Sequence, residues 1–340
     1  MFNFKKFGIA AASLLVAGSA LASNFRAADQ VYVNAAGHVS GASGTFISDV
    51  FLSNLTDDTV TVTVIFSSGP GGLTGDPAIF PAITLAPRER REIVDFFPTA
   101  LGLSSGFGQL IFNGCKQGTS CGSDTQDANG VSPNFRNISA ETRIYSIPPG
   151  TTLSQNPPTN GQLFSGYPWY NFVSSDQVAT GLDRVFITGL RNNGAAGTAG
   201  TYRSNIGLVN ASQFSTTNLV VKLFDKNGTQ IGSAFNQTLG PLGVVQTGIA
   251  NLFPTYTGTT ATGGWVTVEQ TNSTPTSNAP TSCLPNGCPA FFAYASMLDN
   301  STGDATTLEP QYLKPLSDAA ITAIYGQSAG KNIQKRAVKH

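Results

Sequence analysis

Two stretches of this chain, residues 46–66 and 202–231, have the same order of apolar runs and polar turns. In each stretch a first apolar run ends in an asparagine, Asn54 or Asn210, and a polar turn and a second apolar run follow. Such self-similarity indicates two copies of one supersecondary unit, and it limits the fold more than composition does. The sequence therefore predicts a tandem repeat.

The second apolar run of each copy is typical of a β-strand and ends in a phenylalanine, Phe66 or Phe224. Valines alternate with threonines over residues 60–64, which is the period of two expected for a half-buried strand. In the second copy the run is followed by Asn227 and Gly228, a dipeptide that supplies the positive φ angles of a tight hairpin turn.

Each copy continues with a Thr-Leu-x-Pro segment, a Phe-Pro dipeptide, a further strand, a polar loop with two cysteines and a last strand. Because proline cannot donate to a strand ladder, we expect these prolines at strand ends, with a short helical turn just before each Phe-Pro dipeptide. The matching segments are residues 84–87 and 238–241 for Thr-Leu-x-Pro, and Phe97-Pro98 and Phe253-Pro254.

These patterns give roughly six or seven short strands per copy, as in an immunoglobulin-like domain. The 37 glycines, 19 prolines and only 11% charged residues also favour many short strands with turn-rich connections. We predict an all-β chain of two tandem antiparallel β-sandwiches, although the Cys–Trp–Cys core of a true immunoglobulin domain is absent. The expected parts are a signal peptide at 1–22, a first sandwich at 30–150, a Pro-rich and aromatic linker at 151–182, a second sandwich at 183–311 and a C-terminal tail at 312–340.

The N-terminus has the three regions of a secretory signal peptide. Lys5 and Lys6 form a basic region, residues 7–17 form a short apolar region, and Ala20-Leu21-Ala22 is a cleavage site of small residues. The apolar run is too short for a membrane anchor. We therefore predict cleavage after Ala22 and a secreted mature protein, extracellular or periplasmic.

The charge of the mature chain argues against a nucleic-acid partner. Removing residues 1–22 takes away two lysines and no acidic residue, which leaves 17 basic and 19 acidic residues and a net charge of −2. A nucleic-acid-binding surface needs a basic excess. No other apolar stretch is long enough to span a membrane. The partner is unknown, and a glycan or a protein at the cell surface is the candidate.

The four cysteines form two close pairs, Cys115 with Cys121 and Cys283 with Cys288. Export permits disulfide bonds, and four cysteines allow three connectivities. We favour the two local bonds because each pair lies at the same place in its repeat. A zinc site would need the C-x-x-C spacing that neither pair has.

The stretch between the copies has no counterpart after the second copy. Its Pro-rich part leads into an aromatic cluster formed by Tyr167, Trp169 and Tyr170. Two interpretations are open: the rings pack over the junction between the domains, or they form a platform for a sugar ring or a peptide.

Residues that could carry catalysis are scarce. The chain has two histidines, His38 and His340, which nearly excludes Ser-His-Asp and Cys-His sites and centres with several histidine ligands. Residues 326–330 match the G-x-S-x-G nucleophile motif, but no acidic residue follows them. We expect no enzyme activity, no catalytic or cofactor-binding residues, no cofactor and no metal.

Several segments together resemble a group of secreted bacterial proteins. They are VYVNAAGHVSGASGTFISDVFLSN, YRSNIGLVN, VVKLFDKNGTQIG, the Thr-Leu-x-Pro segment, the bridge GQLFSGYPWYNFVSS and FFAYASMLDNSTGD. The resemblance covers about residues 30–310 and leaves the C-terminal tail outside. It implies one or two immunoglobulin-like β-sandwiches, and it brings no catalytic or binding residues because the group has no established biochemical role.

The leading functional hypothesis is a non-enzymatic secreted or cell-surface protein with a structural or adhesive role. The alternative is a glycan- or peptide-binding module that uses Tyr167, Trp169 and Tyr170, or the loops at one end of a sandwich.

Overall fold

The computed structural model of the chain describes residues 27–41, 44–73, 80–125, 132–147, 161–169, 172, 184–277, 279 and 290–312. Antiparallel strands dominate this part of the chain, and helix is limited to short turns such as η1 (Phe97–Leu101) and α2 (Ile249–Leu252). The all-β prediction is confirmed. Within the described ranges, no helix has the length and the apolar run that crossing a bilayer requires.

The strands of the N-terminal half are β1 (Gln30–Gly41), β2 (Gly44–Asn54), β3 (Val60–Ser68), β4 (Ile83–Leu85), β5 (Arg90–Ile93), β6 (Gly106–Lys116), β7 (Ile138–Ile147), β8 (Gly161–Ser165) and β9 (Tyr167–Pro168). We call them the first repeat. They form sheet A, in the order β5-β2-β7-β8, and sheet B, in the order β4-β3-β6-β1-β9. Strand β1 joins the two sheets, because residues 30–38 pair with β6 and residues 39–41 pair with β2.

The strands of the C-terminal half, the second repeat, are β10 (Arg184–Arg191), β11 (Tyr202–Asn210), β12 (Ser215–Phe224), β13 (Gln230–Leu239), β14 (Val244–Gly248), β15 (Thr262–Pro275), β16 (Phe291–Asp299), β17 (Ala305–Leu308) and β18 (Gln311–Tyr312). They form sheet C, in the order β14-β11-β16-β17, and sheet D, in the order β13-β12-β15-β10-β18.

The two repeats have the same strand topology. Replacing each strand of the first repeat by the strand nine places later converts the order of sheet A into that of sheet C, and the order of sheet B into that of sheet D. The self-similarity read from the sequence is therefore present in the pairing of the strands.

Two strand pairings of each repeat match pairings of the immunoglobulin strand order, and the outer strands differ from that order. Strand β2 pairs with β5, and β3 pairs with β6, as B pairs with E and C pairs with F in that fold. The place beside F, which the last strand takes in an immunoglobulin domain, is taken here by the first strand, β1. Strand β7 takes the place beside B.

The two sequence motifs that define the repeat contact each other in both copies. The Asn54 side-chain amide donates to the Ala86 carbonyl at 2.8 Å, and the Asn210 amide donates to the Gly240 carbonyl at 2.8 Å. Ala86 and Gly240 are the variable residues of the two Thr-Leu-x-Pro segments. Both asparagines are buried, so each ties the turn that follows its strand to the end of β4 or β13.

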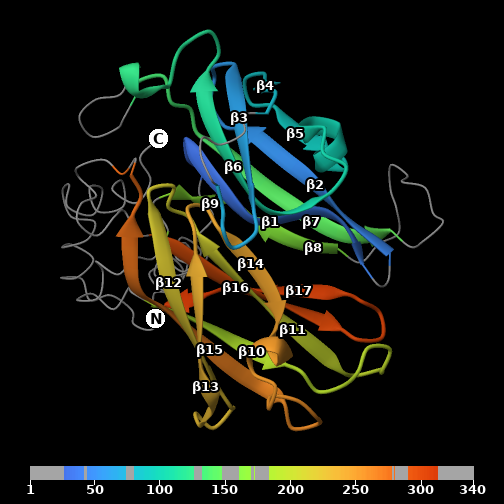
Figure 1. Cartoon of the computed structure of the whole chain (residues 1–340). Coiled ribbons are helices and arrows are strands. Elements are labelled where there is room, and N and C mark those ends of the chain that lie inside the picture. Colours follow the sequence, from blue (N-terminus) through green and yellow to red (C-terminus); the bar gives the residue numbers. More distant parts are fainter. Residues whose placement is uncertain are drawn as a thin grey trace, which may run out of the picture.

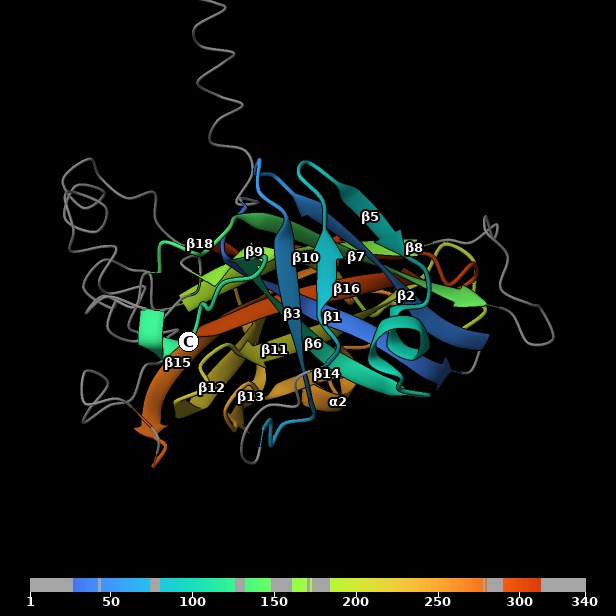
Figure 2. The same ribbon diagram turned by 90° about the horizontal axis from the view of Figure 1, so that it is seen from above.

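Sheet C is buried on both faces, and this makes the two repeats one stack of sheets. Residues 291–296 of β16 are all buried. Phe291, Ala293 and Ala295 pack into the core shared with sheet D, whereas Phe292 and Tyr294 pack into the core of the first repeat. Figure 1 shows the first repeat above the second, and in Figure 2 strands β3 and β6 lie over β11 and β14. A strand buried on both faces reads as a continuous apolar run, as FFAYA does.

The sequence alignment of the copies is wrong by one residue at the end of the second strand run. It pairs Phe66 with Phe224, but Phe66 faces the core and contacts Phe97 edge to face at 5.1 Å, whereas Phe224 lies on the outer face of sheet D. The sheet position of Phe224 corresponds to Ser67, because Ser67 pairs with Gln109 and Phe224 with Trp265 at the same level of the two sheets. A shift of one residue moves a side chain to the opposite face of a strand.

The stretch that the sequence presents as a linker contributes strands to the first repeat. Strand β8 extends sheet A beside β7, and β9 pairs with β1 at the edge of sheet B. The polypeptide thus passes from one repeat to the other through paired strands over residues 161–168.

Candidate functional site

The junction between the repeats is built from backbone hydrogen bonds and a few buried side chains. The loop at residues 69–73 exchanges three backbone hydrogen bonds with the turn at residues 240–244, with N···O distances of 2.8–2.9 Å. From the outer face of sheet B, the Ser67 hydroxyl and the Gln109 amide both donate to the Leu242 carbonyl, at 2.7 and 2.6 Å. These contacts join the two repeats directly.

Aromatic rings fill the rest of the junction. The Phe164 and Tyr294 rings meet edge to face with centroids 5.3 Å apart, and the Tyr294 hydroxyl donates to Gln246 at 2.8 Å. The Tyr294 ring lies over Gly207 on the neighbouring strand, where a Cβ would overlap it. The glycine inside the YRSNIGLVN run therefore makes room for a ring of the junction.

The predicted aromatic platform lies largely in this junction. Tyr167 is buried, with its ring centroid 4.0 Å from that of Phe292. Trp169 is half-buried and donates from Nε1 to the Asp29 carboxylate at 2.8 Å. Tyr170 lies outside the described residues. The Tyr167 ring thus contacts the second repeat, whereas the hydrogen bond from Trp169 to Asp29 is to the first repeat.

The local disulfide prediction is confirmed for the first pair of cysteines. Cys115 and Cys121 are bonded, and their Cα atoms lie 6.0 Å apart, within the range for a disulfide. Cys115 is the second-last residue of β6, so the bond closes the polar loop that leaves this strand. Cys283 and Cys288 lie outside the described residues.

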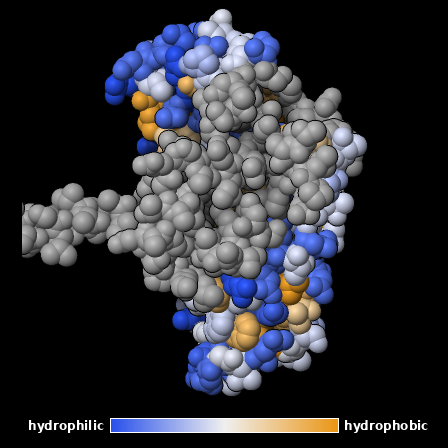
Figure 3. All heavy atoms as spheres, turned by 90° about the vertical axis from the view of Figure 1, so that its left-hand side faces the viewer, coloured by the Kyte–Doolittle hydropathy of each residue, from blue (hydrophilic) through white to orange (hydrophobic). Residues whose placement is uncertain are grey.

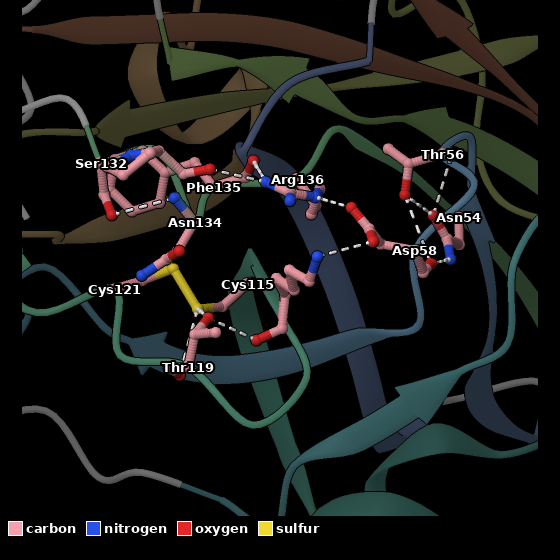
Figure 4. A network of polar contacts seen from close by, with 12 residues as sticks. Asn54, Thr56, Asp58, Cys115, Thr119, Cys121, Ser132, Asn134, Phe135 and Arg136 are labelled. Carbon is pink, nitrogen blue, oxygen red and sulfur yellow. Dashed lines mark hydrogen bonds and ion pairs between the residues drawn. A yellow bond between two sulfur atoms is a disulfide. The ribbon is translucent and has the colours of Figure 1, made fainter.

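A polar network surrounds this loop at one end of the first repeat (Figure 4). Asp58 lies between two cations, with Oδ1 2.9 Å from Lys116 Nζ and Oδ2 2.6 Å from Arg136 Nε. The hydrogen bonds from Lys116 and Arg136 lower the pKa of Asp58. The Asn134 amide donates to the Ser120 carbonyl at 2.7 Å and holds the disulfide loop from its other side. Each of these charges has a partner, so the network is structural.

A second polar cluster lies around His38, which is on β1 and not in a solvated loop. Its Nδ1 is 2.8 Å from the Asp95 carboxylate. The Asp95 amide and the Tyr145 hydroxyl both donate to Asp49 Oδ1, at 3.0 and 3.1 Å. Burial raises the pKa of Asp49 more than these two hydrogen bonds lower it. A histidine–aspartate pair is two thirds of a catalytic triad and needs a nucleophile to act as one.

A row of three aromatic rings crosses the outer face of sheet D. The Trp265 ring on β15 stacks on Phe224 of β12 at 4.3 Å and 14°, and on Phe186 of β10 at 5.8 Å and 26°. We call these three residues the aromatic row, and all three are partly exposed. An ion-paired cluster flanks the row, with Glu269 2.6 Å from Lys222 and 3.6 Å from Arg184. On the face of the molecule shown in Figure 3, apolar atoms lie among polar ones at the bottom, where Figure 1 places the second repeat.

Sequence reasoning missed the aromatic row because its members are far apart in the chain. The signal was present, since Phe224 takes an outward position in the strict alternation of β12, and Phe186 does so beside Val185 and Ile187. In the described part of the chain, no group of three or more His, Cys, Asp or Glu side chains is arranged to hold a metal ion.

Comparisons with known proteins do not identify a family. No protein-family model matches the chain, and no curated protein matches it. Among solved structures, a β-glucuronidase of Parabacteroides merdae aligns with 81% of this chain at 10% identity and a TM-score of 0.12. The alignment spans 28% of the length of that enzyme. A TM-score this low carries no argument about fold or activity.

Proposed function

We propose that this chain is an exported, non-enzymatic protein with a structural or adhesive role at the cell surface or outside the cell. It is built from two tandem β-sandwich modules related to the immunoglobulin fold, at about residues 30–150 and 183–311. One observation carries the proposal: the repeats are fixed to each other through backbone hydrogen bonds and a shared apolar core. A fixed arrangement of modules suits a protein that spaces or bears load.

The export signal and the disulfide support the extracellular location. A disulfide persists outside the reducing cytosol, and the Cys115–Cys121 bond closes an exposed polar loop. Intact-mass measurement of protein recovered outside the cytoplasm tests this part. We expect the mature chain to begin at Ser23 and to be lighter by two hydrogens for each disulfide.

The expected lack of catalysis is tested on the His38–Asp95 pair, which resembles part of a triad. We expect the mature protein to show no turnover on panels of chromogenic esters and glycosides. Turnover that His38→Ala or Asp95→Asn abolishes would overturn the non-enzymatic proposal, provided that the variant keeps its circular dichroism spectrum.

The alternative function is binding of a glycan or peptide, through the rings of the linker or the loops at one end of a sandwich. A buried ring such as Tyr167 has no free face for a sugar. A glycan array with the wild type and the Trp169→Ala variant separates the candidates. Binding that this variant loses would support the linker platform, and binding that it keeps would point to the loops.

A further inference from the structure

In the second repeat, the aromatic row occupies sheet positions whose counterparts in the first repeat contribute to the junction. Tyr32, Ile111 and Ile65 share one level of sheet B, as Phe186, Thr267 and Lys222 share one level of sheet D. The next residues on the same sheet face lie two positions further along β6 and β15, at Gln109 and Trp265. Gln109 and Ser67 therefore correspond to Trp265 and Phe224, and Tyr32 corresponds to Phe186.

In the first repeat, Gln109 and Ser67 receive the second repeat, and Tyr32 contacts the segment between the repeats. Gln109 and Ser67 donate to the Leu242 carbonyl, and the Tyr32 ring packs edge to face on Phe172 at 4.8 Å. The corresponding positions of the second repeat, Phe186, Trp265 and Phe224, are partly exposed to solvent. This face of sheet B is therefore a docking surface inside the molecule, and the corresponding face of sheet D is exposed.

The part that docks on this face also exists twice. In the junction it is the turn at residues 240–244, and its counterpart in the first repeat is the turn at residues 86–90. Arg88 corresponds to Leu242, since both have a positive φ, 57° and 55°. Both also donate their backbone amide to the turn that follows β2 or β11, at Thr56 or Ser212. Arg90 corresponds to Val244, because they pair with equivalent residues of β2 and β11.

The exposed turn and the aromatic row are chemically complementary. The residues at the two docking positions of the turn change from leucine and valine to arginine. The Arg88 side chain is 71% exposed and pairs with Asp57 at 2.7 Å, and the Arg90 guanidinium lies 5.2 Å from the centroid of the Phe51 ring. The receiving positions change from glutamine and serine to tryptophan and phenylalanine. A guanidinium group near an aromatic ring is favourable, and tryptophan is the strongest ring partner.

We infer that a second copy of this chain docks head to tail, its turn at residues 86–90 on the aromatic row of the first copy. The contact repeats the turn-on-sheet part of the junction. Arg88 takes the place of Leu242, whose carbonyl accepts from Gln109 and Ser67, and it lies against Trp265 and Phe224. Arg90, in the place of Val244, lies beside it. Because the two surfaces differ, the contact is heterologous, and each added copy presents a new free row. The assembly is an open chain of copies or a closed ring.

Sedimentation velocity of the mature protein over a range of concentrations, with two variants, tests the inference. One variant, Trp265→Gln with Phe224→Ser, carries the residues that the first repeat has at these positions. The other, Arg88→Ala with Arg90→Ala, removes the cations. We expect the wild type to self-associate, and each variant to do so roughly tenfold or more weakly.

Mixing the two variants provides the decisive readout. The ring variant keeps its arginine turn and the turn variant keeps its rings, so an equimolar mixture should recover dimers but not longer species. A wild type that stays monomeric at its solubility limit overturns the inference. So does a turn variant that associates like the wild type, which would indicate row-to-row pairing. Binding of soluble oligosaccharides that only the ring variant loses would instead make the row a glycan site.

Folding controls keep this test valid. Circular dichroism should match the wild type in both variants, and tryptophan fluorescence should match it in the turn variant, which keeps both Trp169 and Trp265. The Gln and Ser replacements place polar side chains at partly exposed positions, and the Ala replacements lie at exposed positions of the turn, so we expect both variants to fold.

Discussion

At the scale of single residues, a buried asparagine explains the strongest motif of the sequence. Asn210 donates to the carbonyls of Ser215 and Gly240 at 2.7 and 2.8 Å and accepts from the Ser212 amide at 3.0 Å. Asn54 makes the corresponding bonds in the first repeat. A side chain with both a donor and an acceptor group is needed, because backbone groups of both kinds converge on it.

Replacing this asparagine should be costly. We expect Asn210→Ala to lower the free energy of unfolding by about 3 kcal/mol, because it leaves buried carbonyl and amide groups without partners. Urea denaturation measures the loss. Asn218→Ala is the matched control, since the Asn218 amide bonds the Asn272 side chain at an exposed position, and its effect should stay within about 0.5 kcal/mol. Equal losses in both variants would contradict this role.

Two aspartates should respond to pH in opposite directions. Burial raises the pKa of Asp49, so its ionised form is disfavoured in the folded state, and its contribution weakens as pH rises through that pKa. Hydrogen bonds from Lys116 and Arg136 lower the pKa of Asp58, so its contribution is present above about pH 4 and is lost as pH falls.

Asparagine variants at these positions separate the two effects. Relative to the wild type, Asp49→Asn should gain stability as pH rises from acid to neutral, and Asp58→Asn should lose stability over the same range. Denaturation at a series of pH values measures both slopes. Added salt should weaken the Asp58 effect more, because its partners lie near the surface. Slopes of the same sign would contradict the assignment.

At the scale of elements, strand β11 is adapted to lie under a ring. A Cβ on Gly207 would overlap Tyr294 in the buried junction, so we expect Gly207→Ala to destabilise the protein by about 2–3 kcal/mol. Gly248→Ala is the matched control, because the atoms nearest to its Cβ are 3.7 Å away. Thermal unfolding of the two variants should differ clearly. If they unfold at the same temperature, the ring has room to move.

The disulfide loop is a second element with a limited role. Closing so short a loop contributes about 2 kcal/mol in the chain-entropy model. The network around Asp58 and the Asn134 hydrogen bond hold the same loop. Reduction, or Cys115→Ser with Cys121→Ser, should therefore raise hydrogen exchange at residues 115–122 and leave the β-sheet circular dichroism signal intact. Loss of that signal at room temperature would show that the bond does more.

At the scale of the whole molecule, the junction makes the repeats depend on each other. Sheet C lies between two cores, and its outer face carries Val209, Phe292 and Tyr294. The corresponding outer face of sheet A carries charged residues such as Glu141, which occupies the place of Tyr294. The outer face of sheet A is thus suited to contact with solvent, and the outer face of sheet C is suited to burial under another sheet.

A chain reduced to residues 183–311 should therefore be less stable and less soluble than the whole protein. Exposing the outer face of sheet C places apolar rings in water, at a cost of about 25 cal/mol for each Å². We expect one cooperative unfolding transition for the full chain in calorimetry. Two transitions, or an isolated second repeat as stable as the whole, would show that the modules are independent.

The sequence by itself determined the all-β class, the repeat and the first disulfide. These follow from signals in the chain: alternation in residues 60–64, the turn at Asn227 and Gly228, and close cysteine pairs at the same place in each repeat. The sequence did not determine which faces are covered. Outward residues such as Phe224 and Phe292 look alike in the chain, and only the stacking of sheets B and C makes one a surface ring and the other a core ring. The reason is physical: alternation says that a strand has two faces, but the neighbour that covers a face comes from a distant part of the chain.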